Sequence, residues 1–432
     1  MMINGEELFI VEYFEDESCK LLYAPLRMSL FLVSSDTAEA LCSPNGNATK
    51  SVLLDHIRTK ELLDIHHHHA EISKAPPQLS IAITRDCNLG CIYCHANAGV
   101  KGQQTSMTRE QVRMIVQYYF QHIAEHFPGQ KMLQVSFMGG GEPTVRPKLL
   151  RFAVKVCREE AERIGVQPIF STAVNGYFGR SMADYLIAEF NSVSLSFDGP
   201  AFIQNTHRPA KNGRPSFDRV FATAKYFQTH GFPFSLRATV STISLAHYRE
   251  LVDFFADEFP GTQVGFEPLN PMGRGCRVCI APSAAEFAAG IRLIGEYAAC
   301  RGVLINNASL GKFQQIKTVF CGAVSAPGFT ITPEGEIWAC TRENAPDEFR
   351  YGHFDFSSGT VVIDHAKLDF LKIMNVFSFP ECKDCFCKYH CAGDCPDNRL
   401  SNLLRCEATR QLGTQLLNQI YAENAKMSAA RS

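Results

Sequence analysis

The chain has 432 residues, of which 46% are hydrophobic and 20% charged, and its formal net charge is −2. This length predicts about two to three domains with a sizeable core, and the near-neutral charge gives no reason to expect a nucleic-acid partner. No apolar run is long enough to span a membrane. The acidic start, "MMINGEELFIVEYFEDESCK", lacks the basic and apolar regions of a signal peptide. We therefore expect a cytoplasmic protein with no membrane or nucleic-acid partner.

Residues 1–75 are expected to form a small α+β unit. Segments 7–13 and 20–34 have the composition of strands, and segment 49–63 has the periodicity of a helix.

Residues 76–310 alternate between strand-like and helix-like segments. This alternation predicts a parallel sheet with crossover helices, and six such units predict a partial (β/α)6 parallel barrel rather than a closed eight-stranded one. Binding sites in such folds lie at the carboxyl ends of the strands. The expected strands are 79–84, 133–138, 167–174, 193–197, 234–240 and 262–267, and the expected helices are 108–127, 147–165, 181–190, 216–231, 245–259 and 283–302.

Residues 311–432 are expected to form a third, cysteine-rich domain. The segment 329–340 predicts a hairpin with Gly335 near its turn, and 407–426 predicts a closing helix. The chain has 17 cysteines, grouped mainly near residue 90 and between Cys382 and Cys406. In a reducing compartment, thiols clustered at short spacings indicate metal sites rather than a disulfide network.

Three thiols, Cys87, Cys91 and Cys94, follow the first strand of the barrel in "CNLGCIYC". A zinc site usually takes four ligands in two close pairs, whereas a four-iron cluster held by three cysteines keeps one iron open for a ligand. The cluster is the favoured interpretation. A zinc knuckle completed by His95 or by a distant residue stays open as the alternative.

The string "GGEP" at Gly140–Pro143 follows the second strand, and glycines there allow a close backbone approach to a ligand. Together with the Cx3CxYC loop, it resembles the radical S-adenosylmethionine (SAM) superfamily. The resemblance extends over about residues 79–303, through "AVNG" after the third strand, "SLSFDGP" after the fourth and the loop "HRPAKNGRPSFDRV".

The resemblance implies a [4Fe–4S] cluster on Cys87, Cys91 and Cys94 and a SAM molecule chelating its open iron. The reaction it implies is reductive cleavage of SAM to a 5′-deoxyadenosyl radical, which removes a hydrogen atom from a substrate. The residues implied to bind the cofactor are Tyr93, Gly140, Gly141, Glu142, Asn175, Ser196 and Arg237. For the last three a purely structural role, such as an ion pair of Arg237, stays open.

The later cysteines resemble the SPASM extension of radical SAM enzymes, over about residues 316–411, and imply two auxiliary [4Fe–4S] clusters. One set is Cys382, Cys385, Cys391 and Cys406; the other is Cys321, Cys340 and Cys395. The second set has three thiols, so we expect an open iron able to bind a substrate thiolate. Three further cysteines are alternative fourth ligands: Cys276, Cys279 and Cys387. A zinc ribbon over 382–406 also stays possible.

By resemblance, the expected substrate is a ribosomally made precursor peptide or a protein, and the electron donor is flavodoxin or ferredoxin. Residues 1–75 would then help to recognise a leader segment by adding it as a strand to a sheet edge. The expected product is a thioether or carbon–carbon crosslink. Formylglycine formation of the sulfatase-maturase type and peptide epimerisation or decarboxylation are the alternatives. The sulfatase-type enzymes place an aspartate base where this chain has Thr341. The catalytic base is unknown, with Asp198 and Glu267 as candidates, and a non-catalytic iron–sulfur or zinc scaffold is the remaining hypothesis.

Overall fold

The computed structural model describes residues 2–3, 6–43, 53–55, 57–63, 76–102, 105–277, 280–307, 313, 315–342, 346–401 and 404–429. The chain divides into two compact units, each built from segments that are distant in sequence. The larger unit consists of residues 75–308 and 326–372, and the smaller of residues 1–74, 309–325 and 373–432.

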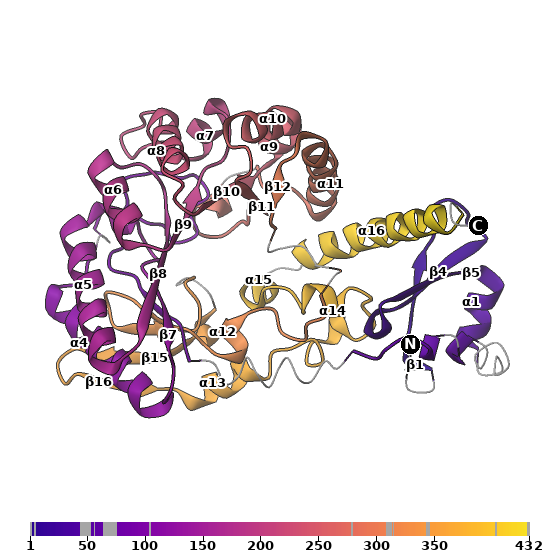
Figure 1. Cartoon of the computed structure of the whole chain (residues 1–432), viewed down its shortest axis with the longest axis horizontal. Helices are drawn as coiled ribbons and strands as arrows, with labels where there is room; N and C mark the ends of the chain where they lie inside the picture. The colour runs from indigo at the N-terminus through magenta and orange to yellow at the C-terminus, as the bar shows by residue number, and fades with distance from the viewer. Residues whose placement is uncertain are drawn as a thin grey trace. The chain divides into compact units, whose positions relative to one another are not determined.

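The larger unit contains a curved sheet that is mostly parallel, with antiparallel strands at one edge (Figure 1). All six predicted barrel strands are present, and a short seventh strand follows them. Their bounds are β6 (Leu79–Ile81), β7 (Met132–Ser136), β8 (Gln167–Val174), β9 (Ser192–Ser196), β10 (Phe234–Val240), β11 (Gln263–Pro268) and β12 (Leu304–Ile305). Strand β12 pairs only with β11 among the described residues, so the barrel is open, as predicted.

Each predicted crossover helix is also present. The helices follow the outer side of the sheet (Figure 1). The predicted helices have the bounds α4 (Arg109–His126), α5 (Pro147–Ile164), α6 (Arg180–Glu189), α8 (Phe217–Thr229), α10 (Tyr248–Glu258) and α11 (Ala284–Arg301). Two short helices, α7 (Ala201–His207) and α9 (Thr242–Ala246), were not predicted. Capping boxes begin α4 at Thr108 and α11 at Ser283, where the side-chain oxygen accepts a hydrogen bond from the third residue of the helix.

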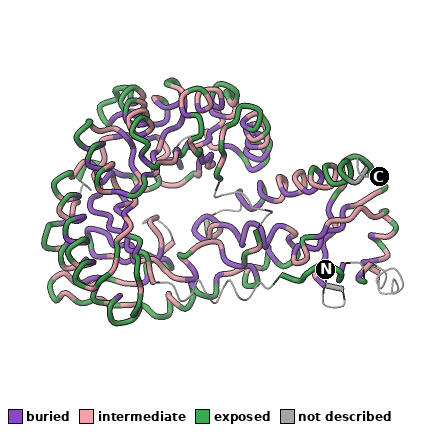
Figure 2. The backbone as a smooth tube through the Cα atoms, viewed as in Figure 1, coloured by how far each residue is buried: buried purple, intermediate pink, exposed green. Residues whose placement is uncertain are grey.

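The core of the larger unit lies between the sheet and the helices, where buried residues follow the strands (Figure 2). Phe197 is fully buried, and its ring contacts four other phenylalanines, Phe217, Phe254, Phe255 and Phe259. Burying a side chain of this size contributes about 1.5–3 kcal/mol.

The predicted hairpin at 329–340 is present, but it belongs to the sheet of the larger unit. Strand β13 (Phe329–Ile331) pairs in parallel with β6, and the sheet then continues through β14 (Glu336–Trp338), β15 (Arg350–Asp355) and β16 (Thr360–Ile363). Helix α13 (His365–Lys372) follows. The three consecutive domains expected from the sequence, 1–75, 76–310 and 311–432, therefore differ from the grouping of the contacts. Residues 326–372 go with the barrel, and the N-terminal segment goes with the remaining cysteine-rich segments.

The smaller unit is built on a three-stranded antiparallel sheet. Its strands are β3 (Phe9–Glu12), β4 (Cys19–Ala24) and β5 (Ser29–Ser34), preceded by a short pair, β1 (Met2–Ile3) and β2 (Glu6–Glu7). Within the predicted helix 49–63, the described residues 53–55 and 57–58 are helical. The helices are α1 (Ser35–Cys42), α12 (Gly322–Ser325), α14 (Lys388–Cys391), α15 (Pro396–Ser401) and α16 (Leu404–Ala429), the last of which includes the predicted closing helix.

Candidate active site at the three-cysteine loop

Cys87, Cys91 and Cys94 lie in the loop that follows β6, here called the cluster loop (residues 85–99). The three thiols interact electrostatically with one another, and all three pack in one small group with Leu89. Burial and the nearby Glu142 carboxylate raise the pKa of Cys87 to about 12, and burial also raises the pKa of Cys91. Thiolates at such a place need a bound cation, which an iron–sulfur cluster supplies.

Two contacts fix the backbone of the cluster loop. The Arg274 guanidinium donates hydrogen bonds to the carbonyl oxygens of Cys91 at 2.9 Å and Ala98 at 3.0 Å. Gly141 lies so close to the start of the loop that a Cβ on it would come within 2.4 Å of the Asp86 carbonyl oxygen. At Gly141, therefore, the group that makes the close approach allowed by glycine is the backbone of the cluster loop itself.

Glu142 is a buried carboxylate at the end of β7, beside Asn175 at the end of β8. Its Oε1 accepts hydrogen bonds from the Thr144 hydroxyl at 2.6 Å and the Thr144 backbone at 3.2 Å, and its Oε2 accepts one from the Asn175 N–H at 2.7 Å. Burial raises the pKa of Glu142, although these hydrogen bonds act in the opposite direction. A carboxylate has about four acceptor positions, so about one is left for a ligand.

Asn175 joins this carboxylate to the cluster loop. Its Nδ2 donates to the Asn88 side chain at 2.7 Å and lies 3.7 Å from the Cys87 sulfur. Of the other predicted cofactor residues, Gly140 has a φ of 53°, in the left-handed region that favours glycine.

Ser196 and Arg237 are register partners on the neighbouring strands β9 and β10. Because side chains alternate between the two faces of a strand, they lie on the face opposite to Leu195 and Leu236, which are buried. Arg237 is exposed, and it has no hydrogen-bond or ion-pair partner in the part of the chain that the structure describes. The structural alternative, an ion pair of Arg237, is not observed.

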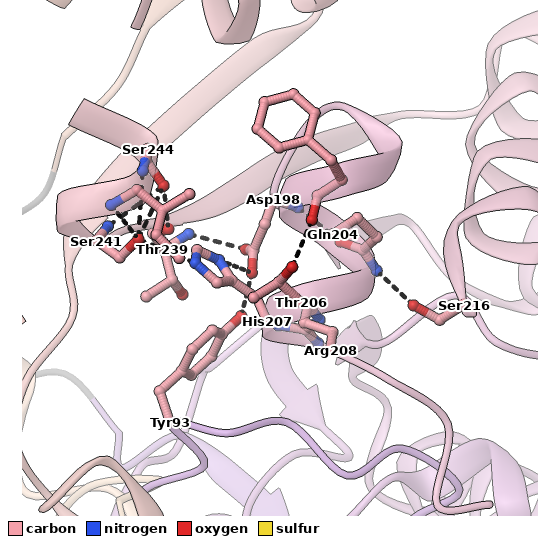
Figure 3. A network of polar contacts seen from close by, with 12 residues as sticks. Tyr93, Asp198, Gln204, Thr206, His207, Arg208, Ser216, Thr239, Ser241 and Ser244 are labelled. Atoms are coloured by element: carbon pink, nitrogen blue, oxygen red, sulfur yellow. Dashed lines mark hydrogen bonds and ion pairs between the residues drawn. The ribbon is translucent and has the colours of Figure 1, made fainter. Parts of the chain in front are cut away.

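Tyr93, the aromatic residue before Cys94, has a fixed orientation. Its hydroxyl donates to Asp198 Oδ2 at 2.5 Å and accepts from Arg208 Nη1 at 2.8 Å (Figure 3). The sequence did not point to Arg208, to His207 or to Arg274 as site residues. The first two occur in the loop "HRPAKNGRPSFDRV", whose resemblance to the superfamily is carried by the whole segment and singles out no side chain.

Asp198 is a poor candidate for a catalytic base. It is 1% exposed, and its carboxylate accepts hydrogen bonds from Tyr93, from the Thr239 backbone at 2.9 Å and from His207 at 3.1 Å. Burial alone raises the pKa of Asp198, but His207 and Arg208 outweigh it and lower the pKa. The other candidate, Glu267, is partly exposed at the end of β11.

In the smaller unit, four of the predicted ligands form one buried group: Cys382, Cys385, Cys391 and Cys406. A hydrogen bond from Cys387, assisted by Arg410 and opposed by burial, lowers the pKa of Cys385 to about 6. Cys387 belongs to the same group. It is fully buried, and Gly413 packs against its sulfur.

The second predicted auxiliary set remains a prediction. Cys321, Cys340 and Cys395 are partly buried; Cys321 and Cys395 belong to the smaller unit and Cys340 to the larger one. Of the alternative fourth ligands, Cys279 lies outside the described residues, as does the side chain of Cys276. In the described ranges, no three His, Cys, Asp or Glu side chains could hold one metal ion. That result concerns single-ion sites such as zinc, because a four-iron cluster is larger.

Residues 81–255, from the first barrel strand into α10, match the Radical SAM superfamily. This chain carries a radical SAM domain. The domain covers the cluster loop, Glu142, Asn175, Ser196 and Arg237, and so includes every residue that was predicted to bind SAM.

Two relatives extend the similarity beyond the radical SAM domain. The serine-type anaerobic sulfatase-maturating enzyme of Klebsiella aerogenes is 25% identical over 327 residues, which are 72% of this chain and 77% of that protein. Mycofactocin maturase MftC of Mycobacterium ulcerans is 27% identical over 275 residues, which are 62% of this chain and 68% of that protein. Each relative therefore matches a larger share of this chain than the radical SAM domain at residues 81–255 does.

Among solved structures, native anSMEcpe with bound AdoMet and Cp18Cys peptide matches with a TM-score of 0.60 and 18% identity. The match covers 83% of this chain and 99% of that one. It confirms the predicted α/β fold. No helix within the described residues is long and apolar enough to cross a membrane.

Proposed function

We propose that this chain is a radical SAM peptide maturase that removes hydrogen from a side chain of a ribosomally made peptide or of a protein. The observation that carries the proposal is the group of three thiols, of which Cys91 is buried and Cys87 and Cys94 partly buried, near the Glu142 carboxylate. Three of the roughly four acceptor positions of this carboxylate are already filled. All these groups follow the carboxyl ends of parallel strands. When bound, a [4Fe–4S] cluster with SAM supplies one-electron cleavage of the sulfonium and hence hydrogen abstraction.

In this proposal the residues of the chain bind and orient the cluster and SAM. Cys87, Cys91 and Cys94 would hold the cluster, and the remaining acceptor position of Glu142 suits an ammonium group. Arg237 presents an exposed guanidinium, which suits a carboxylate. Ser196 is its register neighbour and offers a hydroxyl on the same face.

The two relatives support a peptide or protein as substrate, since one is a sulfatase-maturating enzyme and the other a mycofactocin maturase. Within that class we propose a thioether or carbon–carbon crosslink, with epimerisation as the alternative outcome. The other partner we propose is a flavodoxin or ferredoxin that supplies the electron, in the cytoplasm, where thiols stay reduced.

The cysteine-rich segments suit two auxiliary clusters, and the buried group of Cys382, Cys385, Cys391 and Cys406 supplies four thiols for one of them. For the other, Cys321, Cys340 and Cys395 leave one iron for a substrate thiolate. Cys387 is less suited as its fourth ligand, because it is buried within the first group.

Formylglycine formation is a second candidate, favoured by the sulfatase-maturating relatives and by the anSMEcpe fold. One residue argues against this reaction. Thr341 follows Cys340, and a threonine cannot take a proton from a thiol or hydroxyl near neutral pH as a carboxylate does.

The experiment is anaerobic co-expression with candidate peptides, followed by mass spectrometry and by assay of SAM cleavage after dithionite reduction. Cleavage of SAM with a loss of two hydrogens from a peptide supports crosslinking. An unchanged mass with an inverted residue would mean epimerisation. A brown protein that never cleaves SAM would contradict the proposal and favour a scaffold.

A further inference from the structure

A buried ionic network surrounds Tyr93, and the proposed function gives it no role. This Tyr93 network consists of Tyr93, Asp198, His207, Arg208 and Ser241 (Figure 3). It links the cluster loop to the segment after β9, the end of α7 and the start of α9. Asp198, His207 and Ser241 are at most 1% exposed, and Arg208 is 8% exposed. Burying a guanidinium and a carboxylate is costly unless they compensate one another.

Arg208 is held firmly on one side. Its Nη1 donates to the Tyr93 hydroxyl at 2.8 Å, and its guanidinium carbon lies 5.8 Å from the centre of the Tyr93 ring. The same hydroxyl donates to Asp198 at 2.5 Å. Asp198 is fixed in turn by His207, whose other ring nitrogen lies 3.0 Å from the Ser241 hydroxyl. The network therefore fixes the position of the cation relative to the cluster loop.

On its other side, the Arg208 guanidinium has a donor that is not used. Its Nε is buried, yet it has no hydrogen-bond partner among the residues that the structure describes. Buried donors are nearly always satisfied in folded proteins. The Arg208 charge acts on the Cys91 thiol, one of the three ligands proposed for the cluster. A sulfur acceptor bound at the cluster loop would complete the hydrogen bonding of Arg208.

We propose that Arg208 is a positioning residue for the cluster of Cys87, Cys91 and Cys94, acting as its buried counter-cation. The inference rests on the proposed function, because it requires that cluster. Three thiolate ligands make the cluster anionic, and charge and hydrogen bonds near the sulfurs set its reduction potential. A fixed cation favours the added electron and makes the cluster easier to reduce.

The test compares Arg208→Met with Arg208→Lys in the full-length, anaerobically reconstituted protein. An electron paramagnetic resonance (EPR) redox titration follows the reduced-cluster signal that changes when SAM is added, which separates this cluster from any other. We expect Arg208→Met to lower the equilibrium constant for reduction about tenfold, because a unit charge at close range is lost. A tenfold change for one electron is 59 mV. Arg208→Lys keeps the charge and stays within about threefold of wild type.

Arg158→Met is the matched control. Arg158 also lies over an aromatic ring, that of Phe170, and pairs with a carboxylate, that of Glu189, but its side chain is half exposed on α5. Its removal leaves the titration unchanged. An Arg208→Met protein that titrates like wild type would overturn the inference.

If the Arg208→Met protein loses iron, its redox titration is not informative, and the Arg208→Lys protein then tests the inference. Wild-type iron content and potential in the lysine variant support the counter-cation, whereas loss of iron there as well overturns it. A wild-type protein without any SAM-responsive signal would contradict the proposed function itself, and the inference with it.

Discussion

At the scale of single residues, buried polar side chains decide what the site can do. Asp198 and Glu142 both stand at strand ends, as the sequence predicted, and both are already bound by the chain itself. The sequence could not predict this engagement, because the donors to Asp198 come from the cluster loop, from α7 and from β10. Strand position follows from local periodicity, whereas hydrogen-bond partners follow from the tertiary fold.

Asp198→Asn separates a positioning role from a catalytic one. The substitution removes the buried negative charge that offsets the Arg208 guanidinium across the Tyr93 hydroxyl. We therefore expect a loss of about 3 kcal/mol or more in the free energy of unfolding, together with loss of the SAM-induced EPR change. Thermal unfolding and EPR spectra measure the two effects. A variant with wild-type stability and SAM cleavage, but with no peptide product, would instead identify Asp198 as a catalytic base.

At the scale of secondary-structure elements, the sequence predicted the strands, the crossover helices and the open barrel, because each is encoded by a local apolar pattern. It did not predict that β13 would pair with β6, or that the N-terminal sheet would pack with the cysteine-rich segments. Both depend on contacts between residues more than 200 positions apart. The hydrogen bond of Tyr23 to the buried His390 at 2.5 Å, just before Cys391, is one such contact.

Tyr23→Phe tests whether the N-terminal sheet supports the buried four-thiol group. Without the hydroxyl, the buried His390 ring loses this hydrogen bond, which costs about 1–3 kcal/mol. We expect a lower thermal midpoint and faster loss of iron to a chelator. The control is Tyr13→Phe, whose hydroxyl binds the exposed Glu15 at 2.8 Å. Equal behaviour of the two variants would show that the sheet does not support this group.

Glu334→Gln tests the contact between the hairpin and the cluster loop. Burial acts to raise the pKa of Glu334, but hydrogen bonds from Arg85, at 2.8–3.0 Å, and from Thr105 lower it to about 2. Because the pKa is below its ordinary value of 4.5, the stabilisation is complete above about pH 4.5 and disappears as the pH falls towards 2.

For Glu334→Gln we therefore expect a deficit of roughly 1 kcal/mol at pH 7, since the carboxylate is partly exposed and screened. The difference in thermal midpoint from wild type should stay nearly constant from pH 7 to about pH 5 and shrink as the pH falls from about 4.5 towards 2. A difference that stays constant down to about pH 2 would contradict the ionic origin of the contact.

At the scale of the whole molecule, the distribution of cysteines predicted the function better than the composition did. Near-neutral charge and ordinary hydrophobicity excluded partners but named none. The three-thiol loop, followed one strand later by the "GGEP" string at Gly140–Pro143, predicted the radical SAM domain, and the family match over residues 81–255 confirms it. The substrate is not encoded in this way, because a peptide is recognised by surfaces, and their residues need no fixed spacing.

The most direct measurement is the EPR spectrum of the anaerobically reconstituted, dithionite-reduced protein with and without SAM. The account predicts a [4Fe–4S] signal that SAM perturbs, and predicts that Cys87→Ala abolishes it while the auxiliary signals persist. Zinc bound at the cluster loop, or a reduced spectrum that SAM leaves unchanged, would contradict the account.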